Sequence, residues 1–264
     1  MRAKDIIQFM NMWAPPNLIE DWDNTGFQIG EEEKEINRIL IALDLDNDVY
    51  KYANEKKFDM IITHHPLIFK PISTITTSMA KERLIYNLIK SGIVVFNAHT
   101  NLDQAQGGVS DELARLLELK DCVPLIKNEL KGFQSEYGYG KVGDIEEIDL
   151  YKYLDFVKEK LDISHLVIYG EQDKRVKRVA VCGGSGADFI QNAHEENACI
   201  YITGDIKYHD AQLGNELNLT IIDAGHYHTE KAILPVIKEY IEKKSNDNLC
   251  IEIWDNPSPI YKLY

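Results

Sequence analysis

DMIITHHP at residues 59–66 and IVVFNAHTNLD at 93–103 decide the fold, because each puts a short apolar run directly before polar side chains. Runs of this length are typical of buried β-strands. KERLIYNLIKSG at 81–92 lies between them with its leucines and isoleucines at helical spacing, and Gly92 closes the pattern as a helix end. The order strand, helix, strand predicts parallel strands joined by a covering helix.

The same alternation continues on both sides of this segment. We expect strands at RILIALDLD (38–46), HLVIYG (165–170), RVAVCGGSG (178–186), CIYITGD (199–205) and LTIIDAGHY (219–227). Helices are expected at VYKYANEKKF (49–58), SDELARLLEL (110–119, with Ser110 as its cap), YLDFVKEKLD (153–162) and near ADFIQNAHEENA (187–198). The predicted fold class is α/β, with two α/β domains whose mainly parallel or mixed sheets are covered by helices.

The residue composition of the sequence changes near residue 126. NELKGFQSEYGYGKVGDIEEI at 128–148 is polar and rich in glycine and tyrosine, and we interpret it as the entry to a second domain through short strands or a hairpin. The second half shows the same alternation of strands and helices as the first, without a convincing repeat of residues. Two α/β domains facing each other would place a ligand cleft between them.

Composition narrows the classes of function. The chain has 264 residues, with 43 acidic and 29 basic side chains and a formal charge of −14. This balance, with no basic stripe, argues against nucleic-acid binding. The four cysteines form no C-x-x-C pair, so neither a thiolate zinc site nor a disulfide scaffold is expected. With no signal-peptide core at residues 1–13 and no membrane span, we expect a cytoplasmic protein.

Histidines and acids follow the apolar runs in a pattern that suits metal binding. His64, His65, Asp103, His226 and Glu230 form the candidate ligand set. Imidazole and carboxylate together suit Zn, Fe or Mn. Successive residues of a strand point to opposite faces, so the adjacent histidines are better placed to bind two ions than one. The sequence therefore predicts two divalent metal ions at the carboxyl ends of the strands.

The remaining candidates are weaker. His226 and Glu230 share a helical face if one turn begins there, but Pro235 requires the following helix to kink or to begin later. His99 suits a supporting or structural role better than a ligand role. The acids at 44 and 46 are expected to shape the site without binding metal.

Two polar segments allow more than one interpretation. The glycine-rich residues 183–186 are either a phosphate cradle or, as we favour, a tight turn. The polar cluster of residues 207–210 (KYHD) either faces the cleft or belongs to the solvent-exposed surface without a role in the site.

Six segments together carry a specific family resemblance. They are DWDNTGFQIG (21–30), ITHHPLIF (62–69), NAHTNLDQAQGGVSDELA (97–114), VAVCGGSG (179–186), YITGDIKYHD (201–210) and IIDAGHYHTE (221–230). Nearly end to end, the chain resembles the type 2 homologues of GTP cyclohydrolase I, also called the Nif-three-like dinuclear metal-centre proteins. Matched position by position, the resemblance puts the family's metal ligands on the same five residues.

The resemblance also implies an architecture and an activity. It implies a metal-binding α/β domain at 1–126 plus 223–264, a second α/β domain inserted at 127–222, and a ring-like homohexamer. The predicted function is metal-dependent hydrolysis of C–N bonds, as in GTP cyclohydrolase, in a nucleotide or another phosphate-containing small molecule. No catalytic residue stands out, although a bridging carboxylate or His99 could assist proton movement. The alternative is a non-catalytic metal-binding scaffold or regulatory interaction protein, and a nucleic-acid channel ranks last.

Overall fold

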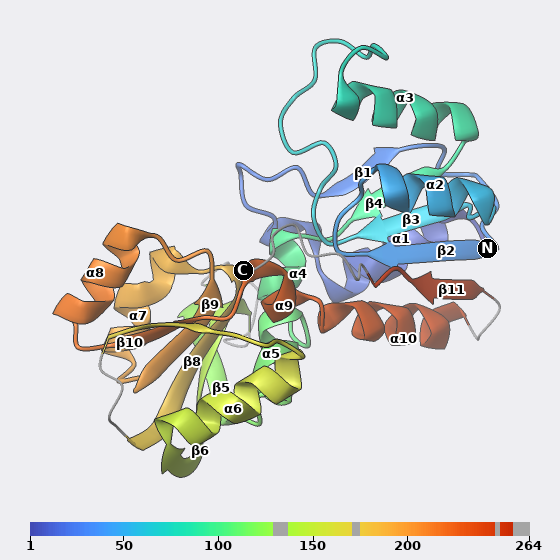
Figure 1. Ribbon diagram of the computed structural model, residues 1–264. Coiled ribbons are helices and arrows are strands. Elements are labelled where there is room, and N and C mark those ends of the chain that lie inside the picture. The colour runs from blue at the N-terminus through green and yellow to red at the C-terminus, as the bar shows by residue number, and fades with distance from the viewer. Residues whose placement is uncertain (129–136, 171–174, 246–248, 256–264) are drawn as a thin grey trace. The chain divides into compact units, whose positions relative to one another are not determined.

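The structure is a computed structural model that describes residues 1–128, 137–170, 175–245 and 249–255 (Figure 1). The chain divides into two compact units. One comprises Met1–Asn101 with Leu234–Tyr264, and the other comprises Leu102–Ile233. The predicted domain bounds, 1–126 with 223–264 and 127–222, stay a prediction.

A five-stranded sheet forms the centre of the first unit. Its order is β1-β4-β3-β2-β11, so the C-terminal strand lies at one edge beside β2 (Figure 1). β2, β3, β4 and β11 are parallel, and only β1 runs antiparallel to its neighbour. The strands are β1 Gly26–Ile29, β2 Arg38–Ala42, β3 Met60–Thr63, β4 Val94–Asn97 and β11 Cys250–Ile253.

Helices cover this sheet because its strands are apolar on both faces. Leu40, Ile61 and Val95 pack with residues of α2 and α3 on one face. Ile39 and Ile62 point to the other face and are also fully buried. The helices of the unit are α1 Ala3–Trp13, the 3-10 helix η1 Pro16–Leu18, α2 Asn47–Glu55, α3 Ala80–Ser91 and α10 Ile233–Ser245, which begins at the unit boundary.

A six-stranded mixed sheet forms the second unit. Its order is β5-β6-β8-β9-β10-β7, with β8, β9 and β10 parallel and the other pairs antiparallel. The strands are β5 Lys120–Lys127, β6 Gly138–Asp149, β7 Val167–Tyr169, β8 Arg175–Ser185, β9 Ile200–Gly204 and β10 Thr220–Asp223. The prediction of an α/β protein with mainly parallel or mixed sheets is confirmed.

Two apolar clusters hold helices on opposite faces of this second sheet. Val179 and Val181 pack with α5 and α6, whereas Ala180 and Cys182 pack with α7 and α8. The alternation along β8 places each pair on its own face. The helices are α4 Thr100–Gln104, which crosses the unit boundary, α5 Val109–Leu116, α6 Leu150–Leu161, the 3-10 helix η2 Ala187–Phe189, α7 Ile190–Glu195, α8 Tyr208–Glu216 and α9 His226–Glu230.

Three local expectations have clear outcomes. Ser110 does not cap its helix, since α5 begins at Val109 with Gly108 in the cap position, and the serine is buried within its first turn. Of the short strands or hairpin expected at 128–148, the structure shows the 12-residue strand β6, which pairs antiparallel with β5 as in a hairpin, and the part at 129–136 lies outside the described residues. Pro235 falls in the first turn of α10, where a missing N–H is tolerated, so the later helix start is confirmed.

Among the residues described here, no helix has both the length and the apolar character that crossing a membrane requires.

Candidate metal centre

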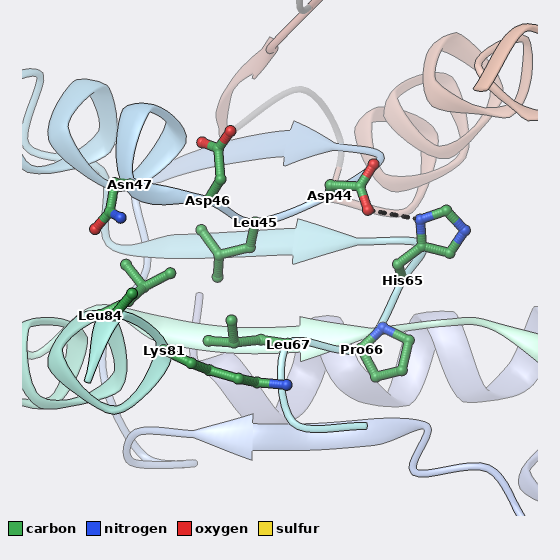
Figure 2. Close-up of a pocket in the computed structure, with 10 residues that line it drawn as sticks. Asp44, Leu45, Asp46, Asn47, His65, Pro66, Leu67, Lys81 and Leu84 are labelled. Carbon is green, nitrogen blue, oxygen red and sulfur yellow. Dashed lines mark hydrogen bonds and ion pairs between the residues drawn. The ribbon is translucent and has the colours of Figure 1, made fainter. Parts of the chain in front are cut away.

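The tandem histidines lie just beyond the carboxyl end of β3. His64 is fully buried, and its Nδ1 lies 2.8 Å from the carbonyl oxygen of Ala98. His65 is half-buried, and its Nδ1 lies 2.8 Å from Asp44 Oδ1 (Figure 2). A carbonyl and a carboxylate accept hydrogen bonds, so both Nδ1 atoms donate. In the neutral rings the lone pair therefore lies on Nε2, the atom that binds a metal.

The strand register explains the pairing of His65 with Asp44. Ala42 of β2 is directly opposite Thr63 of β3, and His65 and Asp44 each lie two residues further on. The N–H of His65 donates to the carbonyl of Leu43 at 3.0 Å, which extends the ladder past both strands. Parallel neighbours that end at the same register thus bring the acid and the imidazole together.

His99 joins the tandem histidines from the segment after β4. The ligand atoms of His64, His65 and His99 lie within 4.8 Å of one another. The Nδ1 of His99 donates to Asp23 Oδ1 at 2.9 Å. Burial acts to raise the pKa of Asp23, but hydrogen bonds from His99, Thr100 and Thr25 outweigh it and hold this pKa well below its usual value. The supporting role expected for His99 stays a prediction.

A pocket of about 330 Å³ opens beside His65 within the first unit (Figure 2). Its apolar wall includes Leu45, Leu67 and Leu84, and Asp44 lies at its polar side. Asp46 accepts hydrogen bonds from the backbone N–H groups of residues 48 and 49, so its role is to cap α2. Of the two acids expected to shape the site, only Asp44 contacts a candidate ligand.

His226 and Glu230 lie together on one turn of helix in the second unit. Both belong to α9, and His226 Nε2 is 3.2 Å from Glu230 Oε2. Asp205 Oδ2 accepts from His226 Nδ1 at 2.8 Å, which puts the ring's lone pair on Nε2 in the neutral form. Two acceptor atoms 3.2 Å apart repel unless a proton or a cation lies with them, so this pair suits a metal ion.

The glycine-rich end of β8 packs closely against the carboxylate of Glu230. Gly184 has φ +68°, and a Cβ there would lie 2.2 Å from Glu230 Oε1. The N–H of Gly184 donates to Thr229 Oγ1 at 2.9 Å, and that of Gly186 donates to Thr203 Oγ1 at 3.0 Å. These two N–H groups bond within the protein, so they form no phosphate cradle. The tight turn favoured from the sequence is not found either, because residues 183–185 form the end of β8, where the pairing with β9 shifts register.

Asp103 in α4 and Glu230 both act on the buried thiol of Cys182. Burial is the largest cause that raises the pKa of Cys182 to about 12, and the negative charge of Asp103 is the next. The charge of Glu230 adds to this effect. The two candidate carboxylates of the second unit thus lie close enough to the same sulfur to influence its ionisation.

Two acids that contact histidines of the candidate site were not predicted from the sequence. Asp23 holds His99, and Asp205 holds His226, yet neither was singled out. Asp205 follows β9 directly, which is the same signal that drew attention to Asp44 after β2. The cluster at 207–210 lies at the surface, since Tyr208 is 79% exposed.

These features define the class of protein before any comparison. It is an α/β protein in which histidines beyond the strand ends, each held by an acid or a carbonyl, form candidate metal-binding groups. A family model described as Duf34/NIF3 (NGG1p interacting factor 3) matches residues 1–259. The chain therefore belongs to the DUF34/NIF3 family, as its motifs predicted.

Individual relatives agree with this assignment. The chain is 37% identical over 267 residues to a GTP cyclohydrolase 1 type 2 homolog of Clostridium acetobutylicum, covering 100% of this chain and 99% of that one. A homolog of the same name in Clostridium perfringens is 35% identical over 250 residues, or 94% of each chain. A Bacillus cereus protein related to NIF3 has the same fold, with a TM-score of 0.91 at 24% identity and coverage of 100% and 99%.

Proposed function

We propose that this protein binds two divalent metal ions and hydrolyses a nucleotide or a related small molecule. The proposed ligands are His64, His65, Asp103, His226 and Glu230. Zn, Fe and Mn all suit this mixture of imidazole and carboxylate. The relatives named GTP cyclohydrolase 1 type 2 homolog support a nucleotide as the first substrate to test.

The observation that carries the proposal is the common way in which the histidines are held. His65, His99 and His226 each donate from Nδ1 to a carboxylate, and His64 donates to a carbonyl. Such partners orient metal-binding histidines and make their Nε2 atoms better ligands. A histidine whose Nδ1 donates to a carboxylate thus occurs in each of the two units. Histidines without a common function would not be expected to share this arrangement.

The chain's own groups can support hydrolysis at such a site. A bound divalent ion would lower the pKa of its water and so supply a hydroxide nucleophile near neutral pH. Glu230 brings negative charge to the site from a side chain that is only 4% exposed. His99, whose Nδ1 proton is held by Asp23, presents Nε2 as a proton acceptor beside His64 and His65.

Metal content is the first test. Native protein should carry close to two divalent ions per chain by elemental analysis, and His65→Ala and Glu230→Ala should each lower that number. His194→Ala is the matched control, because this exposed histidine on α7 belongs to none of the candidate groups found among the described residues. Metal-free native protein, or equal metal in all variants, would refute the proposed centre.

Turnover is the second test. Metal-loaded protein is incubated with GTP and other nucleotides, and the products are separated by chromatography. We expect a product that disappears with a chelator and with His65→Ala. Two ions bound without turnover of any nucleotide would instead support the non-catalytic scaffold. The ring-like homohexamer stays a prediction, which mass measurement in solution can test.

A further inference from the structure

Two exposed aromatic rings continue the histidine cluster of the first unit. Trp22 is 62% exposed and Phe69 is 39% exposed. Their ring centroids are 6.1 Å apart, and each lies 6.4 Å from the ring of His99. His99 lies 5.2 Å from His64 and 5.6 Å from His65. An unbroken group of rings thus leads from an exposed indole to two of the proposed metal ligands.

Hydrogen bonds between the two segments hold these rings in place. Asn24 donates from its side-chain amide to the carbonyl of Ile68. Gln28 accepts from the N–H of Ile68 at 2.8 Å and donates to the carbonyl of Asn24 at 2.7 Å. The residues next to Trp22 and Phe69 are therefore tied to each other through polar contacts. The aromatic pair is built into the fold before any ligand arrives.

A second anchor fixes the segment that carries Trp22. The carboxylate of Asp23 accepts hydrogen bonds from His99 Nδ1 at 2.9 Å and from Thr100 Oγ1 at 2.6 Å. It also accepts from Thr25 Oγ1 at 2.5 Å. One acid thus holds both the histidine of the cluster and the backbone next to the indole. The distance between the indole and His99 follows from this shared anchor.

The ring geometry indicates the chemistry of the ligand. Trp22, Phe69 and His99 meet edge to face, with interplanar angles between 67° and 87°. Rings that meet in this way do not stack on one another, so an exposed face remains on which a flat ring can stack. Proteins hold single nucleobases by stacking on aromatic side chains, which tolerates any base because every base has a π-face.

We propose that Trp22 and Phe69 bind the planar heteroaromatic ring of the substrate beside the metal-binding histidines. This inference rests on the proposed function and names the part of the substrate that the protein recognises. Trp22 and Phe69 are binding residues, and they take no part in proton transfer. The ligand class is a nucleobase or a similar flat nitrogen heterocycle.

Tryptophan fluorescence tests the proposal directly. The chain has three tryptophans, and Trp13 and Trp254 pack against Tyr240 and Tyr52 at 4.8 and 5.0 Å. A Trp13→Phe/Trp254→Phe variant of the full chain leaves Trp22 as the only indole. Guanosine, which carries no phosphate, is titrated into this variant in the presence of a chelator. We expect saturable quenching by guanosine and none by ribose 5-phosphate.

Substitutions then separate stacking from folding. Trp22→Ala and Phe69→Ala, measured by calorimetry in the native background, should each weaken guanosine binding about 10-fold or more. Trp22→Phe should retain most of the affinity, since it keeps an aromatic face. Tyr86→Ala is the matched control, because Tyr86 on α3 is an aromatic residue of the same unit and is 43% exposed. Unchanged circular dichroism identifies the folded variants.

Several results would overturn the proposal. Failure of guanosine to quench the fluorescence of Trp22 would contradict it, and so would binding of guanosine to Trp22→Ala as tight as to the native protein. An indole of Trp22 that iodide fails to reach, because another surface covers it, would also contradict it. The titration contains a chelator and needs no turnover. A failure here therefore leaves the metal analysis of the proposed centre untouched, and a protein without metal could still bind guanosine.

Discussion

Replacing Gly184 by alanine would place a methyl group against the carboxylate of Glu230. The added Cβ would lie 2.2 Å from Oε1 and 3.1 Å from Cδ of Glu230, far inside van der Waals contact. Glu230 is buried, so its side chain must leave its present rotamer to make room. The same position has φ +68°, a conformation that alanine adopts only with strain.

The two effects can be given magnitudes separately. A left-handed conformation costs an L-residue roughly 1–2 kcal/mol. Moving Glu230 off its rotamer costs about 0.5–1.5 kcal/mol more. Gly92 offers a matched control, because it has φ +67° and a Cβ there meets nothing within 4 Å. We therefore expect Gly92→Ala to lose about 1–2 kcal/mol of unfolding free energy and Gly184→Ala about 1.5–3.5 kcal/mol.

A double-mutant cycle isolates the contact with Glu230. Urea unfolding of chelator-treated protein, followed by circular dichroism, gives the unfolding free energy of each variant. In a Glu230→Ala background the clash is gone, so Gly184→Ala should lose only as much as Gly92→Ala. Metal affinity should fall about 10- to 100-fold in Gly184→Ala and stay unchanged in Gly92→Ala. Equal losses at both glycines in the native background, or no coupling with Glu230, would refute this reasoning.

Three further predictions concern the groups around the candidate ligands. Asp205→Asn keeps the shape of the side chain but removes the charge that faces His226, so a chelator competition should show about 10- to 100-fold weaker metal binding. Burial raises the pKa of Cys182 to about 12, so at pH 8 iodoacetamide should modify the exposed Cys250 and reach Cys182 only on unfolding, as mass spectrometry can show. Asp23→Asn should lower the unfolding free energy near pH 7 by roughly 1.5–3 kcal/mol. Because the folded pKa of Asp23 is depressed, that difference should hold above the ordinary value of 3.8 and shrink as the pH falls below it.

The sheets were predictable because their central strands are short, apolar and followed by polar residues. β2, β3 and β4 each lie within a predicted apolar run, and α3 ends before Gly92 as its pattern indicated. The start of α5 was harder, since both Gly108 and Ser110 are acceptable caps and only packing selects between them. The strand β6, between β5 and β8, is long and polar in parts, so no apolar run marked its full length.

The acids that hold the histidines were less predictable than the histidines themselves. Asp23 reaches His99 across 76 residues of chain, from a loop with no strand before it. Nothing local in the sequence marks such a contact, because it depends on how the loop folds over the sheet. Asp205 could have been predicted from the sequence, since it follows β9 as Asp44, which was predicted to shape the site, follows β2.

Each of the two units holds a histidine with an acid by means of the same strand–helix–strand arrangement. In the first, Asp44 and His65 are 21 residues apart and follow parallel neighbours joined by the nine-residue helix α2. In the second, Asp205 and His226 are also 21 residues apart and follow parallel neighbours joined by the nine-residue helix α8.

This shared spacing has a structural cause. A strand, a short helix and a second parallel strand paired with the first return the chain to the same carboxyl end of the sheet after a similar number of residues. An acid placed after the first strand then meets an imidazole placed after the second, and the hydrogen bond between them selects the tautomer whose Nε2 can bind a metal. The similarity between the two halves therefore lies in this backbone unit and its acid–histidine pair, which explains why a search for repeated residues does not reveal it.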